Sequence, residues 1–176
     1  ISTTLTSINN TGLLTATTYQ YQVRATNLDS VATAFDGPVS TRTKALTPPS
    51  AFAGTALAPT SVLWSWTDNS SNETGFRVIT GTVNVSGDLA ANATTWTQSA
   101  LSTNTLYGPY VLQAFNSSGT ENSNSASRQT LAATPTALAV TSVSSTTVAL
   151  SWSANPNPAG TPFELERSTG FGCPLL

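Results

Sequence analysis

The sequence predicts an all-β protein built from β-sandwiches, and three observations lead to this class. Residues 13–27 alternate between apolar and polar side chains, as a strand with one buried face does. Ser and Thr are abundant, Thr favours strands, and no apolar period typical of helices appears. The third observation is an internal repeat, in which PTALAVTSVSSTTVALSW from Pro135 aligns with PSAFAGTALAPTSVLWSW from Pro49 at an offset of 86 residues.

Two stretches combine a turn with a tyrosine at the same spacing. Leu13 precedes Tyr19 by six residues, and Leu101 precedes Tyr107 by six. This spacing resembles the E–F corner of a fibronectin type III (FN3) domain, in which the tyrosine buries its ring and bonds its hydroxyl to the backbone upstream. The stretch WTDNSSNETGF, residues 66–76, is similar to the B–C region of bacterial FN3 modules. The resemblance implies immunoglobulin-like β-sandwiches in tandem, with Tyr19 and Tyr107 anchoring the corners.

Residues 49–134 are expected to form one complete FN3 domain after the Pro48-Pro49 linker. Val62, Trp64 and Trp66 share one face of the second strand, which predicts a core anchored by Trp66. The predicted strands are, in order, Ala51 to Leu57 (A), Ser61 to Trp66 (B), from Phe76 (C), Val83 to Val85, Thr94 to Thr97 (E), Tyr107 to Phe115 (F) and up to about Leu131 (G). Tyr19 precedes Ala25 by six residues, whereas Tyr107 precedes the equivalent Ala114 by seven, so the second copy has one inserted residue. The insertion predicts a β-bulge at Gly108-Pro109.

The two ends of the chain are expected to be complementary half-domains. Residues 1–48 read as strands E (Ser2 to Ser7), F (Tyr19 to Asn27) and G (Ser40 to Leu46), without A, B and C. Residues 135–176 read as A, B and C (Phe163 to Arg167), with Trp152 as the core anchor equivalent to Trp66. A half-sandwich exposes half of its core and is not expected to fold stably alone.

Joined tail to head, the two halves read as one FN3 domain, which predicts a polymer of this unit with itself. Either the repeats are covalently continuous in a longer array, or one copy completes the sandwich of the next by a head-to-tail contact. The alternative is that the match between the two ends is coincidental. The residues expected at the joint are Phe163, Leu165, Leu175 and Leu176 on one side and Ile1, Leu5, Tyr21 and Val23 on the other.

The resulting hypothesis is a structural subunit or segment of an extracellular or cell-surface filament or stalk. The alternative is an FN3 spacer or carbohydrate-binding accessory region of a large secreted enzyme or adhesin. A sugar platform needs exposed aromatic rings, and Trp96 is the one tryptophan whose burial the pattern leaves open. Six sequons are compatible with surface glycans, although composition alone produces such triplets and a bacterial source would mostly leave them bare; their asparagines are Asn9, Asn69, Asn72, Asn84, Asn92 and Asn116.

Composition argues against other functions. The chain has no His and one Lys, so the usual base for nucleophilic catalysis is missing and no enzyme is expected. A net charge of −2 provides no basic footprint for nucleic acid, and no apolar run is long enough to span a membrane. Asp68 and Glu73 could hold calcium, but bracing of their loop is the preferred interpretation. No metal and no cofactor are therefore predicted.

Overall fold

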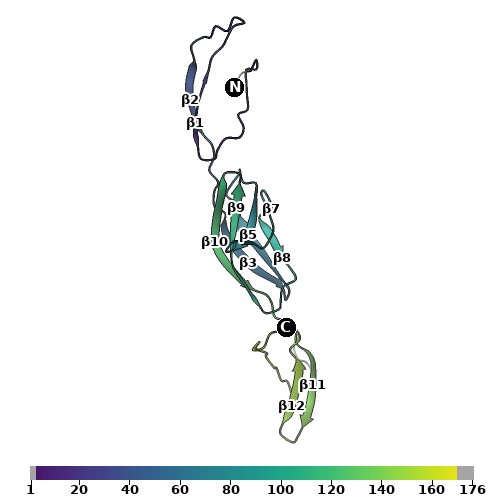
Figure 1. The fold of residues 1–176 in the computed structure, drawn as a ribbon. Helices are drawn as coiled ribbons and strands as arrows, with labels where there is room; N and C mark the ends of the chain where they lie inside the picture. The colour runs from purple at the N-terminus through teal and green to yellow at the C-terminus, as the bar shows by residue number, and fades with distance from the viewer. Residues whose placement is uncertain (1–2, 170–176) are drawn as a thin grey trace. The chain divides into compact units, whose positions relative to one another are not determined.

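The computed structural model describes residues 3–169, and every regular element in this range is a β-strand (Figure 1). The all-β class is therefore confirmed. Among the described residues, no helix offers the length and apolar surface of a membrane span. Contacts between residues divide the chain into two compact units, the first joining Ile1–Ala53, Ser65–Trp96 and Pro109–Ala126, and the second joining Gly54–Trp64, Thr97–Gly108 and Ser127–Leu176.

The middle of the chain forms the two sheets of an immunoglobulin-like sandwich. One sheet has the order β3-β4-β8, from strands Ser50–Ala58, Ser61–Thr67 and Thr95–Gln98. The other has the order β10-β9-β5-β6, from Gly119–Gln129, Leu106–Asn116, Gly75–Thr80 and Val83–Asn84, and the short β7 (Leu89–Ala90) also pairs with β5. In strand letters these are A-B-E and G-F-C with one more strand, as expected when A, B and E share one sheet and C, F and G the other. The predicted strands of this region lie within a few residues of the observed ones.

Among residues 3–169, the buried hydrophobic side chains all come from this middle region. Strands β5 and β9 are antiparallel, with Phe76 opposite Ala114 and Val78 opposite Leu112. The ring of Trp66 lies 5.7 Å from that of Phe76 and links the two sheets within the first unit. Burying each large side chain contributes about 1.5–3 kcal/mol. The buried set is Phe52, Val62, Trp64, Trp66, Phe76, Val78, Tyr110, Leu112 and Ala114.

Strand β9 changes its facing just after the corner. Tyr110, Leu112 and Ala114 are buried at alternate positions, a phase that does not include Tyr107. Gly108 lies between the two phases with φ of +106°, a backbone conformation that glycine adopts without a Cβ clash. The β-bulge expected at Gly108-Pro109 stays a prediction, with which this backbone conformation is compatible.

The first segment forms one antiparallel hairpin, β1 (Thr18–Val23) with β2 (Asp36–Arg42). Three predictions here need correction. The strand predicted for Tyr19 to Asn27 ends at Val23, and that predicted for Ser40 to Leu46 begins and ends earlier. Residues 3–7 form bends and no strand, so the strand predicted for Ser2 to Ser7 is wrong. In the middle region strand E pairs with strand B, and β1 and β2 are the only strands that the structure describes within residues 3–48.

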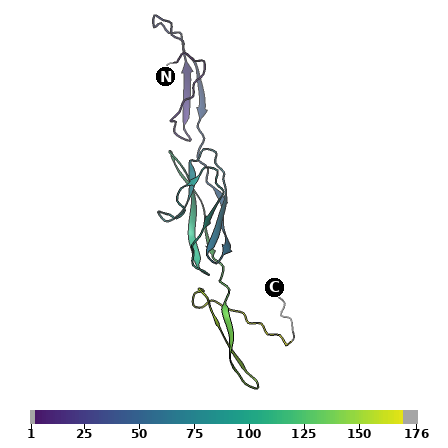
Figure 2. The ribbon, with the colours of Figure 1, turned by 90° about the vertical axis from the view of Figure 1, so that its right-hand side faces the viewer.

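The last segment also forms one hairpin, β11 (Thr136–Val143) with β12 (Val148–Ser153). The strand predicted for Phe163 to Arg167 is wrong, because these residues form no strand. In the middle region strand C pairs with strand F, which this segment lacks. Figure 2 shows the end of the described chain diverging from the β11–β12 hairpin, although Phe163 still packs against Trp152 of β12.

Candidate assembly surfaces

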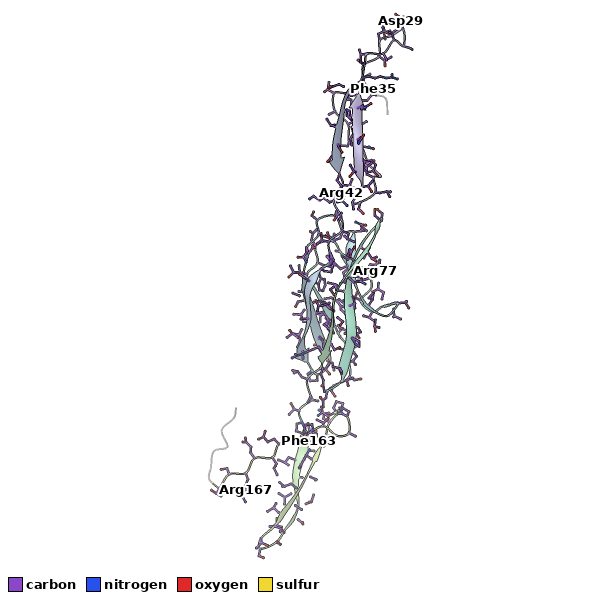
Figure 3. All side chains as sticks on the ribbon, turned by 90° about the vertical axis from the view of Figure 1, so that its left-hand side faces the viewer. Asp29, Phe35, Arg42, Arg77, Phe163 and Arg167 are labelled. Carbon is purple, nitrogen blue, oxygen red and sulfur yellow. The ribbon has the colours of Figure 1, made fainter. Side chains whose placement is uncertain are left out.

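The last segment carries an aromatic pair that matches the core pair of the middle region. Trp152 on β12 and Phe163 have ring centroids 5.9 Å apart, in edge-on geometry. Figure 3 shows Phe163 beside the β11–β12 hairpin. Trp66 and Phe76 stand 86 and 87 residues earlier, and their rings lie 5.7 Å apart in a tilted arrangement. Trp66 and Phe76 are 6% and 0% exposed, whereas Trp152 and Phe163 are 39% and 37% exposed. The aromatic pair of the last segment is therefore partly exposed where its counterpart in the middle region is buried.

The aromatic pair lies in an apolar hollow of about 170 Å³. Leu138 from β11 and Leu165 from the segment after β12 are both exposed at its rim. Apolar side chains exposed together in this way are typical of a surface that another element covers. The residues that form the hollow are Pro135, Thr136, Leu138, Trp152, Phe163, Glu164 and Leu165. We call this set the C-terminal surface.

The first segment carries the counterparts of the buried residues on the other sheet of the middle region, and these are also exposed or only half-buried. Tyr21 and Val23 on β1 stand 89 residues before Tyr110 and Leu112, which are buried on strand β9 of the middle region. Tyr21 is only half-buried here and Val23 is 66% exposed. The Tyr21 hydroxyl oxygen accepts a hydrogen bond from Asn10 Nδ2 at 3.2 Å, which holds the ring beside residues 8–11. We call Leu5, Ile8, Tyr21, Val23 and Val39 the N-terminal surface; all but Tyr21 are exposed.

The predicted joint residues divide between these surfaces. Leu5, Tyr21 and Val23 belong to the first, and Phe163 and Leu165 to the second. Ile1, Leu175 and Leu176 lie outside the described residues. The surfaces belong to different compact units, so each is described by itself and their pairing is a proposal.

The two tyrosine corners have the same hydrogen bonds. The hydroxyl oxygen of Tyr19 accepts a bond from the backbone N–H of Leu14 at 2.9 Å, and that of Tyr107 accepts one from Ser102 at 2.8 Å. A threonine two residues before each tyrosine donates its hydroxyl to a backbone oxygen within the turn, Thr17 to Thr15 and Thr105 to Thr103. The repeat thus extends from sequence spacing to individual bonds.

Replacing Tyr107 with phenylalanine is expected to destabilise the middle region by about 0.5–1.5 kcal/mol, because the Ser102 N–H loses its partner. Chemical denaturation followed by far-ultraviolet circular dichroism measures this change. Leu106→Ala is the control, since Leu106 is an exposed neighbour on the same strand. Equal unfolding midpoints for Tyr107→Phe and the wild type would count against a stabilising role for the corner.

Two acidic residues of the middle region, Asp68 and Glu73, accept hydrogen bonds from backbone N–H groups. Asp68 Oδ1 accepts a hydrogen bond from Ser70 N–H at 2.9 Å, and Glu73 Oε1 accepts one from Asn92 N–H at 3.1 Å. Within residues 3–169, no group of three or more potential metal-ligating side chains comes together. Both carboxylates thus make the bracing contacts that compete with a calcium role.

The sequon asparagines differ in what their amides do. Four donate Nδ2 hydrogen bonds within the fold: Asn69 to Pro48 O, Asn72 to Lys44 O, Asn84 to Asp88 Oδ1 and Asn116 to Asn72 O. Asn9 and Asn92 lie exposed, in the first segment and in the turn after β7. A glycan on an engaged amide would displace part of its bonding, so Asn9 and Asn92 are the sequons whose modification costs the fold least.

Comparison with known proteins identifies no family. No family model and no curated protein matches the chain. The similar solved structures include chicken CNTN1 FN1-FN3 domains (18% identity, 68% of this chain, 45% of that chain, TM-score 0.41) and domains A168-A170 from titin (21%, 55%, 36%, 0.38). The rat CD45 extracellular region, domains d3-d4, is another (13%, 74%, 72%, 0.41). At these values they carry no argument about function. The chain spans less than half the length of the CNTN1 and titin structures.

Proposed function

We propose that this chain is a structural segment of an extracellular or cell-surface filament or stalk built from FN3-type repeats. Its C-terminal surface is covered by the N-terminal surface of the next repeat, so that β11–β12 and β1–β2 together form one sandwich. The observation that carries the proposal is the exposed pair of Trp152 and Phe163, whose counterparts Trp66 and Phe76 are buried.

The middle region supplies the template for this completion. There the A-B-C strands and the F-G strands of one sandwich bury Trp66, Phe76, Tyr110 and Leu112 in one core. The last segment has the counterparts of the first pair, and the first segment has those of the second pair. An interface made in this way resembles a domain core cut in half, which is the character of permanent assemblies.

Composition supports a structural role. Only 8% of residues are charged, and the chain has no His. Such a surface provides no field for steering nucleic acid and no common general base. The partner that its apolar surfaces fit best is another copy of the same repeat. An extracellular location follows from the filament role and is part of the proposal.

The test is mass spectrometry of tryptic peptides from native material. The repeats are expected to be joined, and a peptide in which Ser168 to Leu176 continues into Ile1 to Arg24 would show that the joint is covalent. Separate peptides ending at Leu176 and beginning at Ile1 would show a protomer that completes its neighbour non-covalently. If Leu176 continues into an unrelated sequence, the proposal is wrong and a spacer region of a larger secreted protein becomes the better description.

A further inference from the structure

The linker before the middle region is held by a loop of that region. The loop joins β4 to β5 and is the B–C loop, residues 68–74. The Ser70 hydroxyl accepts a hydrogen bond from Thr47 N–H at 2.8 Å and donates one to Thr47 O at 3.0 Å. Asn69 Nδ2 donates to Pro48 O at 2.9 Å and to Ser50 Oγ at 3.0 Å. Both backbone groups of Thr47 and the carbonyl of Pro48 are thus satisfied by loop side chains.

The same bonds recur at the next linker. Asn155, which stands 86 residues after Asn69, donates Nδ2 to Thr134 O at 3.2 Å, and Thr134 stands 86 residues after Pro48. Ala133 corresponds to Thr47 in the same way. Its N–H donates to Asn157 Oδ1 at 2.7 Å, and its carbonyl accepts from Asn157 Nδ2 at 2.7 Å. The side-chain amide of Asn157 therefore bonds both backbone groups of Ala133, as the hydroxyl of Ser70 bonds both backbone groups of Thr47.

We propose that the B–C loop of each module is a binding surface for the peptide backbone of the segment that precedes the module. We call this set of bonds the linker clamp. Its bonds address only backbone groups of the two clamped linker residues, which are Thr47 and Pro48 at one junction and Ala133 and Thr134 at the other. The clamp is therefore indifferent to linker side chains, and the equivalent bonds persist where the linker sequences differ.

Burial supports the clamp at the second junction, whereas at the first junction Asn69 is exposed and Ser70 is partly buried. Asn157 is among the few buried polar side chains of the described residues, and it also donates to Ala154 O within its own loop. A buried amide that lost these partners would carry a desolvation penalty, so the clamped arrangement is favoured over an open linker. Additional bonds differ between the junctions: Asn72 Nδ2 reaches Lys44 O in the first, and Thr103 Oγ1 reaches Pro156 O in the second.

The functional consequence is that the linkers are ordered connectors rather than free hinges. An extended segment with unpaired backbone groups would sample many conformations, whereas one held through both N–H and C=O has a single set of partners. The clamp joins the residues of each linker to the B–C loop of the module that follows it. It therefore stands whether or not the two terminal surfaces complete each other.

Hydrogen exchange of the full chain, measured by NMR, tests the clamp. The amides of Thr47 and Ala133 are expected to exchange at least about tenfold more slowly than the same amides in an unstructured peptide. Ser70→Ala should remove most of the protection at Thr47 and leave Ala133 unchanged. The reverse is expected for Asn157→Ala. Ser71→Ala is the matched control, because Ser71 contacts Lys44 Nζ and makes no clamp bond.

Exchange of both wild-type amides at unprotected rates would overturn the proposal. So would protection at Thr47 that survives Ser70→Ala unchanged. The wild-type measurement needs no variant, so misfolding of Ser70→Ala cannot leave the question open. Trypsin provides a second readout, because cleavage after Lys44 should be faster in Ser70→Ala than in the wild type.

Discussion

Replacing Trp66 with alanine is expected to destabilise the middle region by about 3–5 kcal/mol, the largest stability effect of any single change described for this chain. Trp66 is 6% exposed and its ring contacts Phe52 at 6.4 Å and Phe76 at 5.7 Å. Truncation removes the side chain that links the two sheets and leaves a cavity that the surrounding strands can fill only in part. Chemical denaturation followed by far-ultraviolet circular dichroism measures the loss.

Two further variants sharpen this experiment. Leu57→Ala removes a side chain that is exposed on β3 and should change stability by about 0.5 kcal/mol or less. Trp66→Phe keeps an aromatic ring but removes the indole nitrogen, which is buried without a hydrogen-bond partner in the described structure. Its cost should therefore fall well below that of Trp66→Ala. A loss under about 1 kcal/mol for Trp66→Ala would contradict the role of Trp66 as core anchor.

The middle region could be predicted almost strand by strand, and the reason is physical. Strands β4 and β9 there bury every second residue, so the alternation of apolar residues in their sequence predicts the strand and its buried face. In the flanking segments the same reasoning predicted strands at Ser2 to Ser7 and at Phe163 to Arg167, where the described residues form none. In the middle region these strands pair with neighbours that lie in the other half of the sandwich. A strand pattern without a neighbouring strand to pair with does not form a ladder.

The linker clamp was not predicted, although its signal is present in the sequence. The sequence predicts that Asp68 and Asn69 satisfy amides of their own turn, which is what such residues usually do. Asp68 does so, but Asn69 and Ser70 bond the preceding linker. Only the 86-residue spacing of Asn69 and Asn155, read together with that of Pro48 and Thr134, distinguishes the two roles. Single-position propensities do not contain that information.

Replacing Trp152 with alanine is expected to leave the middle region as stable as in the wild type and to weaken assembly of the chain. Trp66→Ala should therefore lower the stability of the middle region, whereas Trp152→Ala should weaken assembly. The reason is that Trp66 is buried within the chain, while Trp152 is proposed to be buried only by the next repeat. A buried tryptophan at the centre of an interface contributes about 2–4 kcal/mol, which corresponds to a roughly 30- to 1000-fold rise in Kd.

Sedimentation velocity of the purified chain over a range of concentrations measures this effect. The wild type should form larger species as concentration rises, and Trp152→Ala should shift that transition to higher concentration. Val23→Asp should do the same from the opposite surface, since it places a charge where the N-terminal surface would be buried. Val83→Ala is the control, because Val83 is exposed on β6 and belongs to neither surface. Assembly that is equally strong in all four proteins would show that the two surfaces do not meet, and the exposed aromatic pair would then need a different partner.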